Sequence, residues 1–238
     1  MNAPAMPVAL IGMGRMGQAI DALAHDRSCT IVARIRSDVM SAGLTRDALN
    51  GAQVAIDFTQ PEVAVDNAIA CLRLGCPVVI GTTGWTSRTA ELRRAVKSTK
   101  MAALWSPNFS IGVQLFLAIA EDAARRLRQL STFETHVVET HHRDKKDAPS
   151  GTGIAIADRL AAGLGHAVPI SSVRVGSVPG THEIIMDAPF EQIRLTHEAR
   201  DRRVFADGAL TAARWLASVK KSGLYTMQDV LATGNIGA

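Results

Sequence analysis

The run Pro7-Val8-Ala9-Leu10-Ile11 leads directly into Gly12-Met13-Gly14-Arg15-Met16-Gly17, and this stretch decides the fold. The apolar run predicts a strand, and the residues that follow, 18–24, have the spacing of a helix. In such a strand–turn–helix unit, the first glycine makes the tight turn, the second lets a pyrophosphate approach the backbone, and the third lets the helix pack on the strand. The stretch therefore predicts a dinucleotide-binding turn with residues 12–17 as contacts. A glycine turn without a ligand is the alternative.

The alternation of strand and helix continues through the first half of the chain. Strands are expected at Cys29–Ile35, Gln53–Phe58, Pro77–Ile80 and Met101–Trp105, and helices at Pro61–Leu74 and Ser87–Lys97. This pattern predicts an α/β fold with a Rossmann-type, doubly wound parallel sheet, which binds ligands beyond the carboxyl ends of its strands. The turns at those ends are expected to line one crevice with the Gly12 turn. They supply the candidate cofactor contacts Phe58, Gly81, Thr82, Thr83, Ser106, Asn108 and Phe109.

The end of the second strand bears on which dinucleotide binds. In this fold an acid at that position contacts the adenosine ribose and favours the unphosphorylated cofactor. Arg34 and Arg36 occupy the region instead, and an arginine can pair with a 2′-phosphate through two hydrogen bonds. We therefore expect NADPH to be preferred over NADH, with both arginines as candidate contacts. A solvated surface arginine is the alternative for each.

The pattern changes after Ser110. A long amphipathic helix is expected at Ile111–Arg128, followed by strands at Phe133–Thr140, Ser172–Val175, Thr181–Asp187 and Gln192–Ala199 that a helix at Gly151–Leu164 interrupts. These elements predict an α+β C-terminal domain with an open mixed sheet over residues 111–202, for substrate binding and oligomerisation. Residues 1–110 and 203–238, with a helix at Asp207–Val219, form the dinucleotide-binding domain. Alternation of Val173, Val175, Ile184 and Met186 predicts an apolar sheet face and, as a hypothesis, subunit association through it.

The stretch from Val137 to Thr152 concentrates reactive side chains. A strand end delivers His141 and His142 into a loop that carries Lys145, and Ser150 is the candidate N-cap of the next helix. A helix start beside lysines favours an anion, and histidines exchange protons near neutral pH. An active site and a basic surface loop are equally good interpretations of this stretch alone. A metal site ranks last, because neighbouring strand residues point to opposite faces and no further ligand has a familiar spacing.

Composition narrows the class of protein. With 238 residues, 47% of them hydrophobic and 20% charged, the chain has the balance of a soluble globular protein. Its cysteines, Cys29, Cys71 and Cys76, argue against a disulfide framework and for a reducing, cytoplasmic compartment. We expect neither a membrane span nor a signal peptide. The net charge of +4 fits anionic small-molecule ligands, and an aromatic content of 4% disfavours nucleic acid as a partner.

Residues 141–152, His-His-Arg-Asp-Lys-Lys-Asp-Ala-Pro-Ser-Gly-Thr, resemble the signature of the 4-hydroxy-tetrahydrodipicolinate (dihydrodipicolinate) reductase family. Further matching segments extend the resemblance over nearly the whole chain: Gly14–Gly17, Asp57–Thr59, Gly81–Gly84, Asn108–Ser110, Arg174–Gly176, Gly180–Glu183 and Gly223–Met227. The resemblance implies an NAD(P)H-dependent oxidoreductase of lysine and diaminopimelate biosynthesis that reduces a cyclic dicarboxylate to tetrahydrodipicolinate. It also implies a homotetramer built through the C-terminal sheet.

The resemblance assigns roles residue by residue. It implies that His141 and Lys145 are the catalytic, proton-donating pair, and that the substrate is bound by His142, Ser150, Gly151, Thr152 and Arg202. Gly153 departs from the family pattern, which usually has alanine there. Two alternatives remain: a non-catalytic Rossmann protein that senses NAD(P)H, and a related dehydrogenase such as aspartate dehydrogenase, a family without the Asp-Ala-Pro-Ser-Gly-Thr run.

Overall fold

The structure is a computed structural model that describes residues 4–36, 43–130 and 132–232. The chain divides into two compact units. Unit 1 comprises Met1–Ser110 and Arg203–Ala238, and unit 2 comprises Ile111–Arg202. Over the described ranges, we find no helix whose length and apolar character would let it span a bilayer.

A parallel six-stranded sheet forms the centre of unit 1. Its strands are β1 (Met6–Ile11), β2 (Cys29–Ile35), β3 (Val54–Asp57), β4 (Val78–Ile80), β5 (Ala102–Trp105) and β10 (Gly223–Tyr225). Their order is β10-β5-β4-β3-β1-β2, with parallel pairing throughout. The chain leaves β1 toward β2 on one side and then returns to β3 on the other, so the order reverses at β1. This topology confirms the predicted Rossmann-type sheet, and its reversal point is where such sheets bind ligands.

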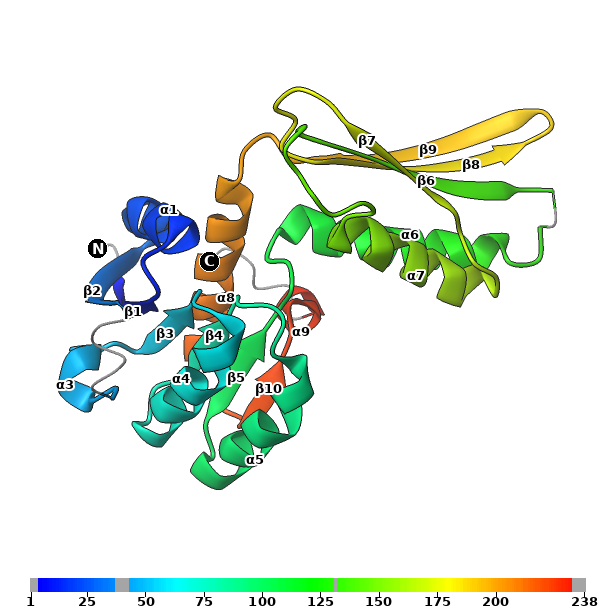
Figure 1. Cartoon of the computed structure of the whole chain (residues 1–238). Helices are drawn as coiled ribbons and strands as arrows, with labels where there is room; N and C mark the ends of the chain where they lie inside the picture. The colour runs from blue at the N-terminus through cyan, green and yellow to red at the C-terminus, as the bar shows by residue number, and fades with distance from the viewer. Residues whose placement is uncertain (1–3, 37–42, 131, 233–238) are drawn as a thin grey trace. The chain divides into compact units, whose positions relative to one another are not determined.

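Helices cover both faces of this sheet. They are α1 (Arg15–Ala24), α3 (Arg46–Leu49), α4 (Pro61–Arg73), α5 (Thr89–Thr99), α8 (Arg203–Ser218) and α9 (Met227–Ala232), with single 3₁₀ turns η1 (His25–Arg27) and η2 (Thr86–Arg88). Helix α1 packs beside α8, and α4 packs beside α5. Figure 1 shows these two pairs on opposite faces of the sheet. The central strands are covered on both sides and are mostly apolar, as in Val8, Leu10 and Val79, which have no exposed surface.

Strand β10 and the start of helix α8 differ from the prediction. The sequence predicts no strand after the last long helix, yet β10 pairs in parallel with β5, Gly223 opposite Ala102 and Tyr225 opposite Leu104. A strand of three residues is too short to show an alternating pattern, and only its partner defines it. Helix α8 begins at Arg203 rather than at Asp207.

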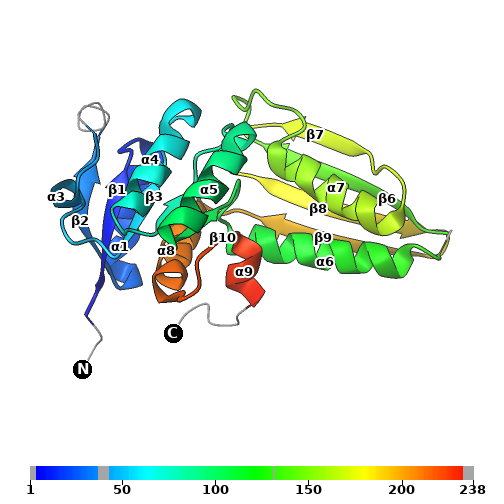
Figure 2. The same cartoon turned by 90° about the horizontal axis from the view of Figure 1, so that it is seen from below.

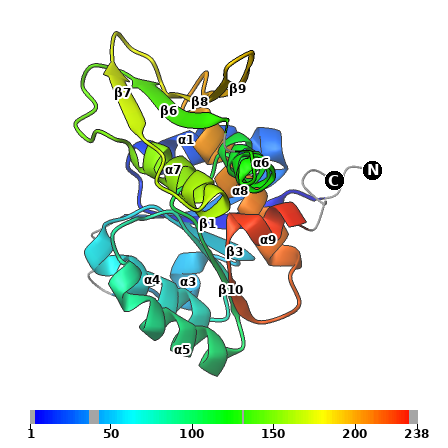
Figure 3. The ribbon, with the colours of Figure 1, turned by 90° about the vertical axis from the view of Figure 1, so that its right-hand side faces the viewer.

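Unit 2 is a mixed four-stranded sheet with two helices. The strands are β6 (Glu134–His141), β7 (Ile170–Arg174), β8 (Thr181–Ala188) and β9 (Glu191–Glu198), in the order β7-β6-β8-β9. Strand β7 is parallel to β6, and the other pairs are antiparallel. Helices α6 (Ile111–Leu127) and α7 (Gly151–Leu164) pack against each other, and Figures 2 and 3 show them side by side on the same face of the sheet. The predicted open mixed sheet is confirmed.

The expectation of a single apolar face formed by four alternating residues is wrong. Ile184 and Met186 are buried, whereas Val173 and Val175 are 43% and 51% exposed. Strand register explains the difference, because Val137 pairs with Ile184 and residues an odd number of positions apart on one strand point to opposite faces. Thr140, three positions beyond Val137, pairs with Val173. Ile184 and Met186 belong to the core with α6 and α7, and Val173 lies on the outer face.

Candidate active site

A pocket of about 440 Å³ lies in unit 1 beyond the carboxyl ends of the strands at which the order reverses. The β1–α1 turn, the end of β2 and the segment after β3 line it, through Gly12, Met13, Gly14, Gln18, Arg36, Phe58, Thr59, Gln60 and Val63. The position is the one at which doubly wound sheets bind nucleotides. The sequence singled out the glycine turn, Arg36 and Phe58, and it missed the polar residues Gln18, Thr59 and Gln60.

The three glycines of the turn differ in their structural surroundings. Gly12 has φ +92, and a Cβ there would lie 2.3 Å from the carbonyl oxygen of Phe58. A Cβ on Gly17 would lie 2.1 Å from the carbonyl oxygen of Gly12. At Gly14 φ is −73, and a Cβ would meet no atom within 4 Å. The fold therefore requires glycine at 12 and 17, and the open space at Gly14 fits a ligand that approaches the backbone.

Phe58 connects the turns at this edge of the sheet. Its carbonyl oxygen lies against Gly12, and its ring would be 2.1 Å from a Cβ on Gly81. The ring also packs on Phe109, with centroids 5.9 Å apart at 57°. The turns after β1, β3, β4 and β5 thus meet at Phe58, the first through its carbonyl and the last two through its ring.

A buried carboxylate, Asp57, holds the turns after β3 and β4 in place. It accepts hydrogen bonds from the Thr59 amide (3.1 Å), the Thr59 hydroxyl (2.8 Å), the Thr82 hydroxyl (3.0 Å) and the Asn67 amide group (2.9 Å). Burial raises the pKa of Asp57, although these hydrogen bonds act in the opposite direction. Thr82, a predicted cofactor contact, uses its hydroxyl in this network and therefore shapes the turn.

The remaining predicted cofactor contacts are mostly parts of loop structure. The Ser106 hydroxyl donates to the carbonyl of Asn108 (2.6 Å) and accepts from its amide (3.2 Å), and the Asn108 side chain accepts from the Ser110 amide (2.9 Å). Arg15 and Thr83 are exposed, and Met16 is half-buried. Ser106 and Asn108 therefore fix the course of the loop after β5.

The two arginines near the end of β2 have different surroundings. Arg34 forms a two-pronged ion pair with Asp21 of α1, at 2.6 and 2.7 Å. Of the two candidates, Arg36 is the one that lines the pocket.

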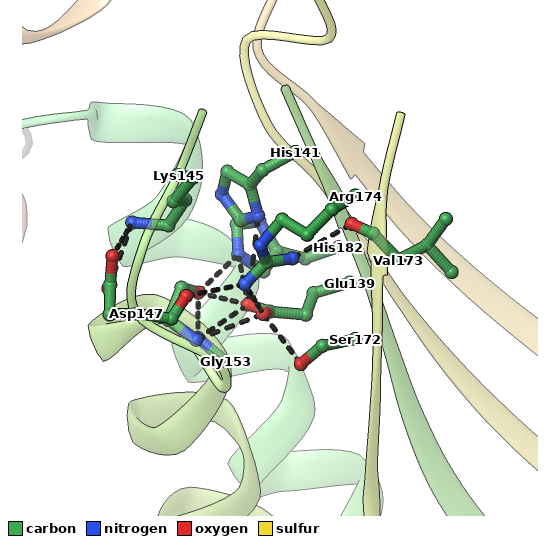
Figure 4. A network of polar contacts seen from close by, with 10 residues as sticks. Glu139, His141, Lys145, Asp147, Gly153, Ser172, Val173, Arg174 and His182 are labelled. Carbon is green, nitrogen blue, oxygen red and sulfur yellow. Dashed lines mark hydrogen bonds and ion pairs between the residues drawn. The ribbon is translucent and has the colours of Figure 1, made fainter. Parts of the chain in front are cut away.

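Unit 2 contains a polar cluster centred on Glu139, a fully buried residue of β6. Its carboxylate accepts hydrogen bonds from the Ser150 amide (2.9 and 3.0 Å), the Ser172 hydroxyl (2.8 Å) and Nη2 of Arg174 (2.7 Å), and from the Ser150 hydroxyl. Figure 4 shows these contacts converging from β6, β7 and the start of α7. Burial alone would raise the pKa of Glu139, but the hydrogen bonds from Ser150, Arg174 and Ser172 lower it to about 2, so the group is ionised.

Two buried histidines flank this carboxylate. Nδ1 of His141 and Nε2 of His182 each lie 3.8 Å from Oε2 of Glu139, and the two rings meet edge to face with centroids 5.1 Å apart. Burial lowers the pKa of His141, and it lowers that of His182 to about 4. Both imidazoles are therefore neutral at pH 7.

Lys145 and Asp147 form an ion pair in the loop before α7. Nζ of Lys145 lies 2.8 and 2.9 Å from the two carboxylate oxygens of Asp147, as Figure 4 shows. Arg174 anchors this loop because its Nη2 also donates to the carbonyl of Asp147 (2.6 Å). The Asp147 side chain is 58% exposed, so solvent weakens the pair.

The start of α7 partly meets the prediction. Ser150 is the N-cap, and its hydroxyl accepts from the Gly153 amide (3.0 Å). The Ser150 amide, however, is already bound to Glu139. Space beside Gly151 is open, since a Cβ there would meet no atom within 4 Å, whereas a Cβ on Gly153 would lie 2.8 Å from Oε2 of Glu139. Close approach of Glu139 thus accounts for the glycine at 153, where the family pattern usually has alanine.

Two predicted substrate contacts take no part in the hydrogen bonds around Glu139. Arg202 is exposed and directly precedes α8, and the network of Figure 4 does not include it. His142 follows β6 and is half-buried, and its carbonyl accepts from the Lys145 amide (3.1 Å). The structure therefore groups His141, Lys145 and the start of α7, without Arg202.

Within the described ranges, Glu139, His141 and His182 have ligand-type atoms within 4.8 Å of one another. A cation at this point would face the guanidinium of Arg174, which already neutralises Glu139 at 2.7 Å. A charge that is already paired gives little attraction to a metal ion.

Sequence reasoning missed Glu139, Ser172, Arg174 and His182 as members of this site. Strand pairing brings them together, since Glu139 is opposite Ser172 on one side and His182 on the other. The Arg174–Gly176 and Gly180–Glu183 segments of the family resemblance contain two of them and were the available signal.

The neutral His182 predicts a loss of stability in acid. Its pKa is about 4 in the fold against 6.5 for an ordinary histidine, so between these values the unfolded chain binds more protons and stability falls as pH falls. We expect wild type to lose up to about 3 kcal/mol more than His182→Gln between pH 6.5 and 4. Urea unfolding of both proteins at a series of pH values measures this. Parallel pH dependences would contradict a buried neutral His182.

Unit 1 is a Rossmann-type unit with a glycine-turn pocket, and unit 2 contains the buried cluster around Glu139. Together they define a two-domain Rossmann protein. Comparison with known families is more specific. Residues 6–109 match the family model described as dihydrodipicolinate reductase, N-terminus, and residues 112–231 match the model described as dihydrodipicolinate reductase, C-terminus. The chain belongs to the dihydrodipicolinate reductase family.

Individual relatives agree with this assignment. The chain is 35% identical to the 4-hydroxy-tetrahydrodipicolinate reductase of Christiangramia forsetii, over 95% of this chain and 98% of the relative. It is 34% identical to that of Thiobacillus denitrificans, over 94% and 97%. Among solved structures, the dipicolinate-bound dihydrodipicolinate reductase from Paenisporosarcina sp. TG-14 superposes with a TM-score of 0.79 at 23% identity, covering 93% of this chain and 97% of that one. Aspartate dehydrogenase from Thermotoga maritima shares only the fold, with a TM-score of 0.50 at 11% identity over 92% and 99%.

Proposed function

We propose that this chain catalyses the NAD(P)H-dependent reduction of 4-hydroxy-tetrahydrodipicolinate to tetrahydrodipicolinate in lysine and diaminopimelate biosynthesis. The observation that carries the proposal is the match of both halves of the chain to one reductase family. The glycine-turn pocket of unit 1 and the cluster around Glu139 in unit 2 supply the two kinds of site that the reaction needs. We find no observation that favours a sensor or an amino-acid dehydrogenase.

Unit 1 holds the cofactor in this proposal, and unit 2 holds the substrate. The pyrophosphate lies at the open backbone of Gly14, at the start of α1. The bound cofactor supplies the hydride. One carboxylate of the substrate is bound by the Gly151 amide and by Lys145, which exchanges Asp147 for it, with Thr152 and His142 nearby. His141 or Lys145 then donates the proton that the reduced ring requires.

A coupled assay tests the proposed reaction. The upstream synthase generates the unstable substrate in the cuvette, and absorbance of NADPH or NADH is followed in separate runs. We expect oxidation that depends on both the synthase and this chain. Cofactor binding without oxidation would contradict the proposal and point to a sensor.

Arg36 governs the choice of cofactor in this proposal. We expect Arg36→Glu to reduce kcat/KM for NADPH by at least about tenfold, because it replaces an attractive contact with the 2′-phosphate by a repulsive one, and to leave NADH use much less affected. The matched variant is Arg34→Gln, which loses the pair with Asp21 and the hydrogen bond to the Ile31 carbonyl and is expected to keep the NADPH to NADH ratio. Kinetics with both cofactors measure the ratio, and an unchanged preference in Arg36→Glu would refute this assignment.

We also propose a homotetramer formed through the outer face of the unit 2 sheet. Within the described part of unit 2, α6 and α7 pack on the other face, and Val173 is 43% exposed on the outer one. Exposed apolar side chains on an uncovered sheet are typical of subunit interfaces. Light scattering should give four times the chain mass, and a monomeric mass would remove this proposal.

We place the enzyme in the cytoplasm. Cys29, Cys71 and Cys76 are free and buried, and burial raises the pKa of each thiol. Thiols of this kind are inert and fit a reducing compartment.

A further inference from the structure

We propose that Glu139 is a positioning residue for His141. Its carboxylate directs the single proton of the neutral imidazole to Nδ1, so a proton taken up from solvent enters at Nε2. The resulting imidazolium donates that Nε2 proton to the reduced substrate and returns to the neutral ring. The inference rests on the proposed function, because it describes how one of the two candidate proton donors is held.

The carboxylate of Glu139 is immobilised before it meets the histidine. Ser150 binds it from the start of α7, and Ser172 and Arg174 bind it from β7, at distances of 2.7 to 3.0 Å. The side chain has no exposed surface. A carboxylate that accepts this many hydrogen bonds from two segments is held in one orientation, unlike a less constrained acid on the surface.

The two nitrogens of His141 have unlike surroundings. Glu139 and His141 are two positions apart on β6 and share a face, and Nδ1 lies 3.8 Å from Oε2. Nδ1 is buried and has no hydrogen-bond partner in the described part of the chain. Nε2 lies next to Gly180, and a Cβ built on Gly180 would be 3.1 Å from this nitrogen. A proton on Nδ1 is attracted to the carboxylate, whereas a lone pair there is repelled by it.

Other charged and titratable groups face His141 from each neighbouring element. Arg174 lies on β7, His182 on β8, and Lys145 with Asp147 in the loop before α7. Lys145 and Arg174 disfavour the imidazolium and Asp147 favours it, while Glu139 is the largest favourable charge. Glu139 is therefore the group whose removal most changes both the tautomer and the charge of the ring.

The test is long-range proton–nitrogen correlation NMR of the full chain labelled with ¹⁵N-histidine. Signals of His141 are assigned by their loss in His141→Gln. At pH 7.5 we expect the Nδ1–H tautomer in wild type. In Glu139→Gln we expect a shift toward Nε2–H, a lower pKa of His141 because the favourable charge is lost, and a kcat at least about tenfold lower with KM for NADPH unchanged.

Glu183→Gln is the matched control. It makes the same change of charge on β8, at a residue that faces away from α7 and pairs with Arg194 at 2.9 Å, and it should leave the His141 tautomer unchanged. An Nε2–H tautomer in wild type would overturn the inference without need of any variant, even if the coupled assay succeeds. An Nδ1–H tautomer that shifts in Glu139→Gln supports it, and a failed coupled assay would then count against the proposed reaction alone.

Discussion

Replacing Lys145 by Met or His141 by Gln should lower kcat by about 10² to 10⁴-fold, the usual contribution of a positioned proton donor. Lys145 also binds the substrate in our proposal, so its loss should raise KM for the substrate as well. Affinity for NADPH should remain, because the pocket of unit 1 contains neither residue. Steady-state kinetics in the coupled assay and fluorescence titration with NADPH separate these effects.

Each of these variants has a neighbour that serves as its control. Lys146 is exposed in the same loop, so Lys146→Met makes the same chemical change outside the cluster. His136 lies on the outer face of β6, where its ring bonds to the Ser171 hydroxyl at 2.8 Å, so His136→Gln matches His141→Gln. Near wild-type turnover in both Lys145→Met and His141→Gln would refute the catalytic assignment.

Alanine at Gly14 and at Gly17 should separate ligand binding from folding. At Gly17 the added Cβ would overlap the Gly12 carbonyl at 2.1 Å, so we expect a loss of several kcal/mol in stability together with loss of cofactor binding. At Gly14 the space is open, and stability should change by less than about 1 kcal/mol. The methyl group would nevertheless stand where the pyrophosphate approaches, and NADPH affinity should fall by at least about tenfold.

Thermal unfolding and NADPH titration of the two variants measure this contrast. If Gly14→Ala binds NADPH as wild type does, the turn is structural and the pyrophosphate lies elsewhere.

The sequence predicts unit 1 well because its signals are local. A strand, a glycine turn and a helix follow one another within residues 6–24, and each repeat of the pattern adds one strand to the sheet. Strand β10 is the exception, since three residues with no period of their own become a strand only by pairing with β5.

Unit 2 is harder to predict because its site depends on strand register. From the sequence alone, Glu139 is an ordinary polar residue within a strand. Its role depends on pairing with Ser172 and His182, which are 33 and 43 positions later in the chain. The missing register also explains the error over Val173 and Ile184. Each strand alternates as predicted, but its own sequence does not show which alternate set of residues faces the helices. The motif itself locates His141, Lys145 and the N-cap Ser150. It does not show that the Ser150 amide already donates a hydrogen bond to Glu139.

A crystal structure with NADPH and dipicolinate bound tests the central claim most directly, since that claim is that the start of α7 and Lys145 together bind a substrate carboxylate. We predict a carboxylate oxygen at about 3 Å from the Gly151 amide nitrogen, with Nζ of Lys145 moved from Asp147 to the ligand. A dipicolinate whose carboxylates contact neither Gly151 nor Lys145 would contradict the account.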